Sequence, residues 1–544
     1  GIRDVERSRG LGDVYKRQVS IRYNHLKTHK GTLNIILNIE YTLHKEQIHT
    51  HITIENRSGI PISEFWFPRL QGIQTLGGDP TEDYLLLPER MGERIQNPLA
   101  YLEGGEGPFW GYNEENLFRL SVYPGGYASM KWMGFFNSQE GIYLGYHSDS
   151  VETMSLYSKL CPKDITGSNY NSLEMGLIRY PFIDPGERCE FDPFVIALVD
   201  GDWHQGAHIY RKAVEKWYKP VSQPDWIKNS NGWQLSGMKH QFGKSFYSYH
   251  DFLKVYNDAQ RGGISELSIF GWWAGGMDNL YPHYEVDKKM GGKEVLKHNL
   301  AEIKKKGGHT ILYTQGRLID PQTSFYRKKG KDIAIHNRND IEIRESYCFA
   351  EEGSLMRIGT KGVLGSNLHP FVAVCPNNKA WFDQIYKQTE TVRNLGANGI
   401  LWDQLAATIP YLCFSKNHNH KKPAQSVGPG NLHNVRKIRQ EFKAKDSNFA
   451  FITEGVYDAM SQYIDMFHGL WRYSREYPAL SQGFKDRPRL GVFPEMFRYT
   501  FPEVIMTDRV IIVNDITETN WTFLLGTVSY THLRAHETSL HLVC

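Results

Sequence analysis

Two short apolar runs that each end in a carboxylate constrain the fold of this chain more than any other feature. The first is Gly399–Gln404 (GILWDQ), and the second is Phe449–Gly455 (FAFITEG). Continuous apolar runs of this length are typical of strands buried on both faces, as in a parallel sheet. In a (β/α)8 barrel the C-terminal ends of all strands converge on one active site. Asp403 and Glu454 are therefore predicted to lie at the same site.

Strand-like and helix-like segments alternate from about Trp226 onward, which predicts a parallel sheet. The expected strands are Gly232–Ser236, Leu267–Trp272, Thr310–Thr314, Gly399–Trp402, Phe449–Thr453, Ile464–Phe467 and Val510–Val513, and Phe371–Val374 is expected to be a short strand or extended piece outside this series. The expected helices are Tyr249–Ala259, Gly292–Lys306, Asn378–Leu395 and Val435–Lys443, and the polar stretch Lys416–Asn431 is expected to be a loop. We predict a TIM-type (β/α)8 catalytic barrel over residues 226–527.

Residues 19–200 have a different pattern, with many short strands and frequent turns. Thr32–Tyr41 and Ile48–Glu55 alternate apolar and polar residues, as half-buried antiparallel strands do. This pattern predicts a β-sandwich. The connection over residues 201–225 is expected to open with a helix at Asp202–Lys216, with Asp202 as its N-cap.

Both ends of the chain resemble translated sequencing adaptor. Residues 1–18 match the in-frame translation of a library adaptor and transposon end, and residues 528–544 match the reverse complement of the same oligonucleotide. Such segments are set aside before fold reasoning. We therefore expect a metagenomic fragment whose sandwich and barrel are both incomplete, and whose open sheet edge lowers its solubility. The compartment (periplasmic, secreted or cytoplasmic) stays open.

Charge and cysteine usage narrow the class of protein. Without the six basic and four acidic residues of the two ends, the 63 basic and 60 acidic residues fall to 57 and 56, a net charge of +1. A near-neutral chain has no general attraction to nucleic acid, and no apolar stretch has transmembrane length. The natural cysteines are widely spaced, which argues against a zinc ribbon and a dense disulfide framework, although one bridge is not excluded. They are Cys161, Cys189, Cys348, Cys375 and Cys413.

Two carboxylates at neighbouring strand ends are the minimum equipment of a retaining glycosidase. Adjacent strands lie about 4.8 Å apart, so two such acids can reach the separation of about 5.5 Å that retaining enzymes use. Asp403, with the shorter side chain after a buried strand, is predicted to be the nucleophile. Glu454 is predicted to be the acid/base. For either acid alone, a structural role such as helix capping is a serious alternative.

Polar and aromatic residues after other strands could bind a sugar, although loop packing also explains them. The substrate-binding candidates are Trp272, Trp273, Asp278, His283, Tyr313, Gln315, Arg317, Trp402, Gln404 and His468. His418 and His420 resemble a metal pair, but no third ligand has suitable spacing. They are expected to be solvated loop side chains, and no metal or other cofactor is expected.

The strand-end motifs resemble a known group of enzymes. A β-sandwich before a barrel, with Ile400–Asp403 on strand four and Thr453–Gly455 on strand five, is similar to the α-retaining glycosidases. Within this group the chain looks most like an uncharacterised family of proposed glycoside hydrolases, and more distantly like endo-α-N-acetylgalactosaminidases and α-amylases. The resemblance implies bacterial breakdown of α-linked glycans of galactoside, N-acetylgalactosaminide or glucoside type. Leu401 stands where the α-amylase pattern has arginine, so the amylase substrate is not carried over.

Two other functions remain open at this stage. A carbohydrate-binding protein on a barrel without catalytic activity would keep the same pattern. A Mg²⁺-dependent enolase-type enzyme would use Asp403 and Glu454 as metal ligands, but it needs a third carboxylate at the next strand end. His468 stands near that position, and Asp465 comes too early.

Overall fold

The computed structural model describes residues 5–6, 17–29, 31–103, 118–163, 167, 169–239, 243, 245–346, 370–407, 410–469, 491–509 and 528–532. The chain divides into two compact units. The first comprises Gly1–Lys219, Tyr457–Ala459 and Arg472–Pro502, and the second comprises Pro220–Val456, Met460–Trp471 and Glu503–Cys544. The first unit thus includes residues beyond 456 that lie within the range predicted to be the barrel.

The first unit contains two antiparallel sheets. The ten-stranded sheet has the order β1 (Val5–Glu6), β2 (Arg17–Tyr23), β5 (Ile35–His44), β6 (Gln47–Asn56), β15 (Arg188–Asp200), β12 (Glu140–Tyr146), β11 (Trp132–Phe136), β8 (Tyr84–Leu87), β9 (Glu93–Gln96) and β25 (Gly491–Val492). The second sheet has the order β10 (Phe118–Tyr123), β13 (Met154–Cys161), β14 (Ser172–Arg179) and β7 (Phe65–Ile73), and β3 (Leu26–Thr28) and β4 (Gly31–Leu33) form a hairpin.

Aromatic side chains join the faces of the two sheets. Phe65 of β7 stacks on Phe191 of β15, with the ring centroids 5.2 Å apart, and Phe67 meets Phe194 at 5.3 Å. The interior is therefore a layer of apolar side chains between sheets, as in a sandwich. Among the described residues of this unit, the helices α1 (Pro98–Glu103), α4 (Trp203–Val214) and α15 (Glu495–Thr500) accompany the sheets. The predicted N-cap is confirmed, because the carboxylate of Asp202 accepts a hydrogen bond from the backbone N–H of His204.

The second unit is built around a barrel of parallel strands. Their order is β16 (Gly232–Gly237), β17 (Glu266–Phe270), β18 (His309–Gln315), β22 (Gly399–Ala406), β23 (Ala450–Gly455), β24 (Met466–His468), β26 (Met506–Arg509) and β27 (Val528–His532). β27 lies in the stretch predicted to be adaptor-derived, and it pairs with both β26 and β16. The predicted combination of a β domain with a parallel α/β barrel is confirmed at this level.

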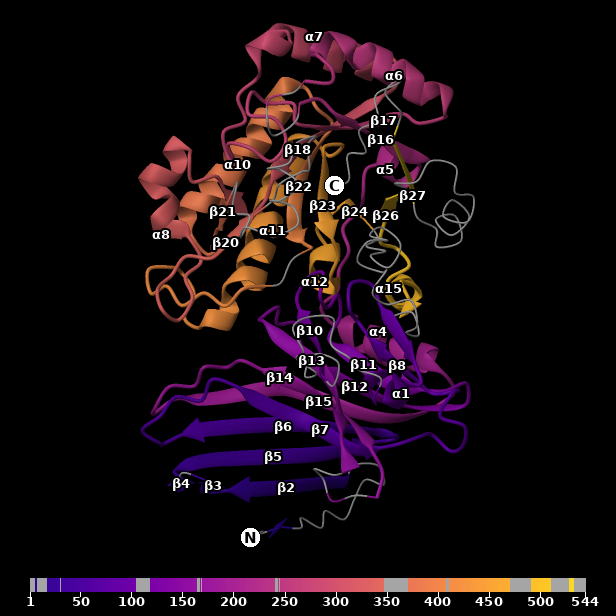
Figure 1. The fold of residues 1–544 in the computed structure, drawn as a ribbon, viewed down its shortest axis with the longest axis vertical. Coiled ribbons are helices and arrows are strands. Elements are labelled where there is room, and N and C mark those ends of the chain that lie inside the picture. Colours follow the sequence, from indigo (N-terminus) through magenta and orange to yellow (C-terminus); the bar gives the residue numbers. More distant parts are fainter. Residues whose placement is uncertain are drawn as a thin grey trace. The chain divides into compact units, whose positions relative to one another are not determined.

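Helices lie beside the barrel strands β17, β18, β22 and β23 (Figure 1). They are α5 (Asp225–Lys228), α6 (Phe252–Arg261), α7 (Gly292–Lys305), α8 (Lys331–Ile333), α10 (Lys379–Leu395) and α11 (Val427–Lys445), and α12 (Asp458–Ser461) follows β23. α6 packs on β17, α7 on β18 and α10 on β22. A small antiparallel sheet of β19 (Leu318–Ile319), β21 (Pro370–Ala373) and β20 (Arg344–Ser346) lies in the chain between β18 and α10.

Most of the predicted barrel elements coincide with observed ones, but one prediction is wrong and one is not described. The stretch predicted as a polar loop, Lys416–Asn431, becomes helical at its end, because α11 begins at Val427. Small residues permit this start. A Cβ atom at Gly430 would lie 2.7 Å from the side chains of both Pro376 and Asn377. The expected strand Val510–Val513 lies outside the described residues.

No helix in the described ranges is both long enough and apolar enough to span a membrane.

Candidate functional site

Asp403 and Glu454 lie on neighbouring parallel strands, as predicted. Asp403 is on β22 and Glu454 is on β23, and the two strands pair with Trp402 opposite Thr453. The Thr453 hydroxyl donates a 2.6 Å hydrogen bond to the carbonyl of Trp402, which ties the strands together beside the two acids. Asp403 is 8% exposed and Glu454 is 9% exposed. Two nearly buried carboxylates therefore stand at the C-terminal end of adjacent barrel strands.

The backbone turns sharply after each acid. Gln404 has φ 64°, a left-handed conformation that is unusual for glutamine, and Gly455 has φ 73°. A Cβ atom at Gly455 would lie 2.4 Å from the carbonyl oxygen of Ala406. Residues held in such conformations often occur at functional sites. The close approach at Gly455 requires glycine and keeps the ends of β22 and β23 together.

Neighbouring side chains on β18 hold the Asp403 carboxylate. Gln315 is the backbone partner of Asp403 across the two strands, and its side-chain amide lies 3.4 Å from Oδ2. The hydroxyl of Tyr313 donates a 2.8 Å hydrogen bond to the same oxygen. A hydrogen bond to an ionised group favours its charged form. The site is therefore arranged to keep a carboxylate at this position.

A second tyrosine extends this contact to another acid. The Tyr281 hydroxyl lies 2.9 Å from that of Tyr313 and donates a 2.6 Å bond to Oδ1 of Asp278. Burial, followed by the charges of Asp403 and Asp278 and the neighbouring tyrosines, raises the pKa of Tyr313 well above its ordinary value. Burial and Asp278 do the same for the pKa of Tyr281. Both hydroxyls keep their protons at neutral pH. Each has one proton and donates it to its own acid, so the two oxygens lie in contact without a proton between them.

The three tryptophans predicted to bind sugar are fully buried in this structure. Trp272 stacks on Tyr284 and donates through Nε1 to the carbonyl of Tyr313, and Trp273 lies parallel to the Tyr313 ring, with the centroids 5.8 Å apart. Both rings thus support the tyrosine that contacts Asp403. Trp402 packs at 5.0 Å against Phe451, whose ring meets Phe442 of α11. None of the three rings is exposed in this structure, and their role in sugar binding stays a prediction.

Arg317 and Gln404 form a polar group beside Asp403. The Arg317 guanidinium donates a 3.0 Å bond to Oε1 of Gln404, and it also pairs with Glu345 at 2.9 Å. The Arg317 backbone N–H bonds to the side-chain oxygen of Gln315. Arg317 is therefore bonded both to Gln404, which follows Asp403 in the chain, and to Gln315, the partner of Asp403 on β18.

The two predicted histidines occupy different places. His468 is the backbone partner of Glu454 and is 3% exposed. Its ring lies 5.1 Å from that of Trp233, on β16. His283 is partly exposed, and its Nε2 lies 3.5 Å from the hydroxyl of Ser324. The structure thus brings His468 to the strand that bears Glu454, whereas no contact of His283 with either acid is recorded among the described residues.

Sequence reasoning did not single out several residues that take part in this arrangement. Tyr281, Tyr284 and Glu345 are the clearest cases, since they contact Asp278, the Gln315 backbone and Arg317, respectively. Tyr281 and Tyr284 lie in the Tyr-Pro-His-Tyr segment directly after the candidate Asp278, so their position was the available signal. Glu345 is preceded by the long connection after β18 and carries no local signal.

The interpretation of His418 as a solvated loop side chain is wrong. His418 is 8% exposed, and its Nδ1 lies 3.3 Å from the sulfur of Cys413. His420 is partly buried in the same group, which also includes Cys375. The spacing argument failed because the other possible ligands are cysteines. Cys413 lies close to His418 in the sequence, whereas Cys375 lies before α10.

Comparison with known proteins places this chain in a family. A family model described as "Domain of unknown function (DUF6259)" matches residues 192–501, which is more than half of the chain. A curated protein of Monosiga brevicollis named "Putative glycoside hydrolase 22789" is 24% identical over 346 residues, which cover 58% of this chain and 27% of that protein. One of Bacteroides thetaiotaomicron with the name "Putative glycoside hydrolase" is 25% identical over 227 residues, 39% of this chain and 29% of that protein. The chain thus spans between a quarter and a third of the length of these relatives.

Solved structures share the fold at low identity. The α-N-acetylgalactosaminidase NagBb of Bifidobacterium bifidum, in a complex with GalNAc, superposes with a TM-score of 0.70 at 12% identity, covering 97% of this chain and 80% of that one. The GH36 α-galactosidase AgaB of Geobacillus stearothermophilus gives a TM-score of 0.55 at 11% identity, covering 96% and 67%. The predicted resemblance to glycoside hydrolases is confirmed by these relatives and neighbours.

Proposed function

We propose that this chain, which belongs to the family described as "Domain of unknown function (DUF6259)", is the core of a retaining glycoside hydrolase that acts on α-linked glycans. The observation that carries the proposal is the pair of nearly buried acids, Asp403 and Glu454, on adjacent parallel strands. The relatives named as glycoside hydrolases and the fold shared with an α-N-acetylgalactosaminidase and an α-galactosidase support it. We also propose that the barrel is of the (β/α)8 type.

In this proposal Asp403 is the nucleophile. Its carboxylate attacks the anomeric carbon of the sugar while the bond from that carbon to the leaving oxygen breaks. The attack consumes the negative charge that Tyr313 and Gln315 stabilise. These two donors fix the direction of the carboxylate, and a positioned nucleophile removes part of the entropic barrier of the reaction.

Glu454 is the acid/base of the same proposal. As a carboxylic acid, it donates its proton to the leaving oxygen. In the second step, the resulting carboxylate removes a proton from water, whose oxygen attacks the anomeric carbon and breaks the ester bond to Asp403. Two inversions at one carbon leave the α configuration unchanged.

The enolase-type alternative has less support. It needs a third carboxylate at the end of β24, where the partner of Glu454 is His468. The nearby Asp465 is fully buried and is bound by the Arg439 guanidinium at 2.8 Å and 2.9 Å. It also accepts the backbone N–H of Phe451. Asp465 is therefore committed to holding β23, β24 and α11 together.

The proposal is tested by hydrolysis of a panel of aryl α- and β-glycosides that includes galactosides, N-acetylgalactosaminides and glucosides. Asp403→Ala and Glu454→Gln are compared with the unmodified chain and with Asp383→Ala, which removes an exposed carboxylate paired with Lys379 on α10. We expect cleavage of an α-glycoside that is reduced at least about a thousandfold by Asp403→Ala and is unchanged in the control. Activity that survives both active-site substitutions would refute the assignment.

A further inference from the structure

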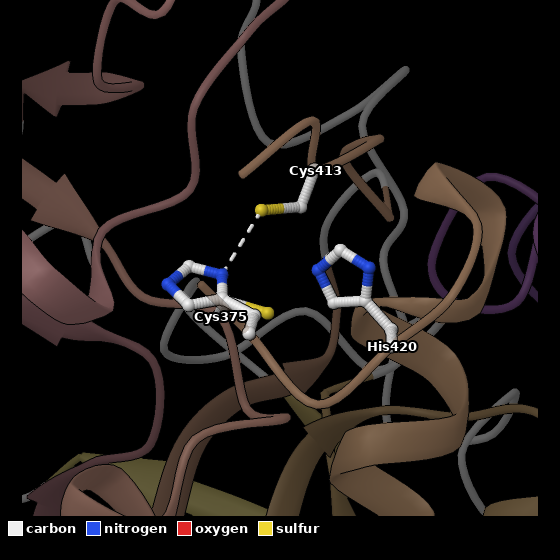
Figure 2. Close-up of side chains that lie close together, drawn as sticks. Cys375, Cys413 and His420 are labelled. Atoms are coloured by element: carbon white, nitrogen blue, oxygen red, sulfur yellow. Dashed lines mark hydrogen bonds between the residues drawn. The ribbon is translucent and has the colours of Figure 1, made fainter. Parts of the chain in front are cut away.

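A compact group of four metal-binding side chains lies in the second unit, separate from the two acids. It consists of Cys375, Cys413, His418 and His420, whose ligand atoms all lie within 4.8 Å of one another. Figure 2 shows the sulfur of Cys413 and the ring of His420 turned toward the same small space, with Cys375 beside them. The two cysteines are fully buried and are not joined by a disulfide. Four donors of the soft and borderline types thus converge on one point.

The fold brings these residues together from two segments. Cys375 follows β21, whereas the other three come from the connection between β22 and α11. Hydrogen bonds join the two segments. The backbone N–H of Asn419 donates to the carbonyl oxygen of Asn377, and the side-chain amide of Asn377 donates to the carbonyl oxygen of Gln425. The backbone N–H of Cys375 also donates to the carbonyl oxygen of Ile333. These bonds hold the connection against the segment that follows β21.

The hydrogen bonds of His418 leave one ring nitrogen directed at the group. Its Nε2 lies 2.9 Å from the carbonyl oxygen of Asp332, which can only accept, so Nε2 carries the proton and donates it. In the neutral ring, Nδ1 then has a free lone pair, and it faces the sulfur of Cys413 at 3.3 Å. Metal-binding histidines commonly donate their other ring N–H to a backbone carbonyl in this way.

A ring nitrogen of His420 gives an independent indication of a missing ligand. Its Nε2 is buried and has no hydrogen-bond partner among the residues that the structure describes. A buried polar atom without a partner costs about 1–3 kcal/mol. Native proteins seldom leave such an atom unsatisfied, and an ion at the centre of the group would satisfy it.

We propose that Cys375, Cys413, His418 and His420 bind one Zn²⁺ ion as a structural Cys2His2 site. Zinc–sulfur and zinc–nitrogen distances of about 2.3 and 2.05 Å place neighbouring tetrahedral ligand atoms about 3.3–3.8 Å apart. A sulfur and a nitrogen ligand would lie about 3.5 Å apart, close to the 3.3 Å contact, and the outer limit of 4.8 Å requires the group to contract by about 1 Å. Two sulfur and two nitrogen donors in tetrahedral geometry favour zinc. Two thiolates, formed by release of their protons, balance the charge of the ion.

Such a site would fix the connection that follows the strand bearing Asp403. Four protein ligands leave no open position, so the ion is structural and takes no part in the proposed hydrolysis. The inference does not depend on the proposed function, because its readouts are metal content and stability. Closing a loop by a metal also restricts the unfolded chain.

The first experiment measures the metal content of the chain purified in reducing buffer without chelators. We expect one zinc per chain by inductively coupled plasma mass spectrometry. Replacement by Co²⁺ should give the intense visible absorption of a tetrahedral site with thiolate ligands. A chain that contains no zinc and takes up neither ion under reducing conditions would overturn the proposal. So would a Cys375–Cys413 disulfide that persists in that buffer.

Variants then assign the ligands. Cys413→Ser and His420→Ala should each weaken zinc binding at least about tenfold, as measured by competition with a chromophoric chelator. Cys161→Ser is the matched control, since it alters another buried cysteine in the first unit and should leave zinc binding unchanged. Should Cys413→Ser not fold, the milder His420→Ala carries the same test, with circular dichroism to verify folding. Equal zinc affinity in a folded His420→Ala variant would contradict the assignment.

Discussion

Removing the Tyr313 hydroxyl tests how the site holds its proposed nucleophile. This hydroxyl is fully buried and donates a 2.8 Å bond to Oδ2 of Asp403. A hydrogen bond to a charged group contributes about 1.5–3 kcal/mol. A shift of one pH unit in a titration corresponds to about 1.36 kcal/mol. Losing a hydrogen bond that stabilises only the ionised carboxylate should therefore move the titration by about one to two pH units. In Tyr313→Phe the acidic limb of kcat/KM should therefore move upward by this amount.

The assay is the pH dependence of kcat/KM on the best aryl α-glycoside, in which the acidic limb reports the ionisation of the free enzyme. Tyr249→Phe is the matched control, because that buried hydroxyl donates to the carbonyl of Trp272 and accepts the backbone N–H of Asp287. It should lower stability and leave the acidic limb in place. An unmoved limb in a folded Tyr313→Phe variant, or the same shift in both variants, would refute the reasoning.

Three further predictions concern stability. Gly455→Ala should lower the free energy of unfolding by about 1–2 kcal/mol for the left-handed backbone, and by more for the 2.4 Å contact of the added Cβ. Its melting temperature should therefore fall well below that of Gly186→Ala, where φ is 86° and nothing lies within 4 Å of the added Cβ. Equal losses of stability in the two variants would contradict the packing argument. Arg439→Met leaves the buried Asp465 carboxylate with Lys443 at 3.3 Å as its remaining ion-pair partner, so the free energy of unfolding in urea should fall by at most about 3–5 kcal/mol. A loss below about 1 kcal/mol would count against the importance of the arginine pair. Burial, followed by nearby positive groups, lowers the pKa of His147 to about 3. The unfolded chain therefore binds a proton near pH 6.5 that the folded chain does not bind, and stability should fall as the pH drops from about 6.5 toward 3. Melting curves of His147→Gln should show a weaker dependence on pH.

The sequence contained enough information for the main elements of the barrel and for the two acids. Apolar runs of strand length and the capped helix Lys379–Leu395, with Asn378 before it and Gly396 after it, follow from local rules, and they coincide with the observed elements. The position of an acid at the end of such a run is then fixed by chain geometry. For this reason Asp403 and Glu454 could be placed on adjacent strands without a structure.

The surroundings of the acids depend on contacts between distant segments, which local patterns do not encode. The sequence predicts that Trp272 and Trp273 bind the substrate, and in the structure their packing with Tyr284 and Tyr313 buries both rings completely. The composition of an aromatic segment does not reveal which face will be covered. The hydrogen bonds that Tyr281 and Tyr313 donate to Asp278 and Asp403 likewise depend on side-chain positions in separate segments of the chain.

The Cys and His group shows the same limit for metal sites. Motif rules recognise ligands that are close in the sequence, and His418 and His420 alone do not satisfy them. Cys375 joins them only because the connection before α11 folds back to the residue that follows β21. Three-dimensional proximity was therefore the missing information.

The central claim is that Asp403 is the nucleophile of a retaining glycosidase, and the most direct test is the configuration of the glycosyl azide formed by Asp403→Ala. Azide can occupy the space of the lost carboxylate and attack an activated aryl α-glycoside once, which inverts the anomeric carbon. We predict a β-glycosyl azide by NMR from this variant, and an α-glycosyl azide from Glu454→Ala, in which azide replaces water in the second step. An α-glycosyl azide from Asp403→Ala would contradict the account.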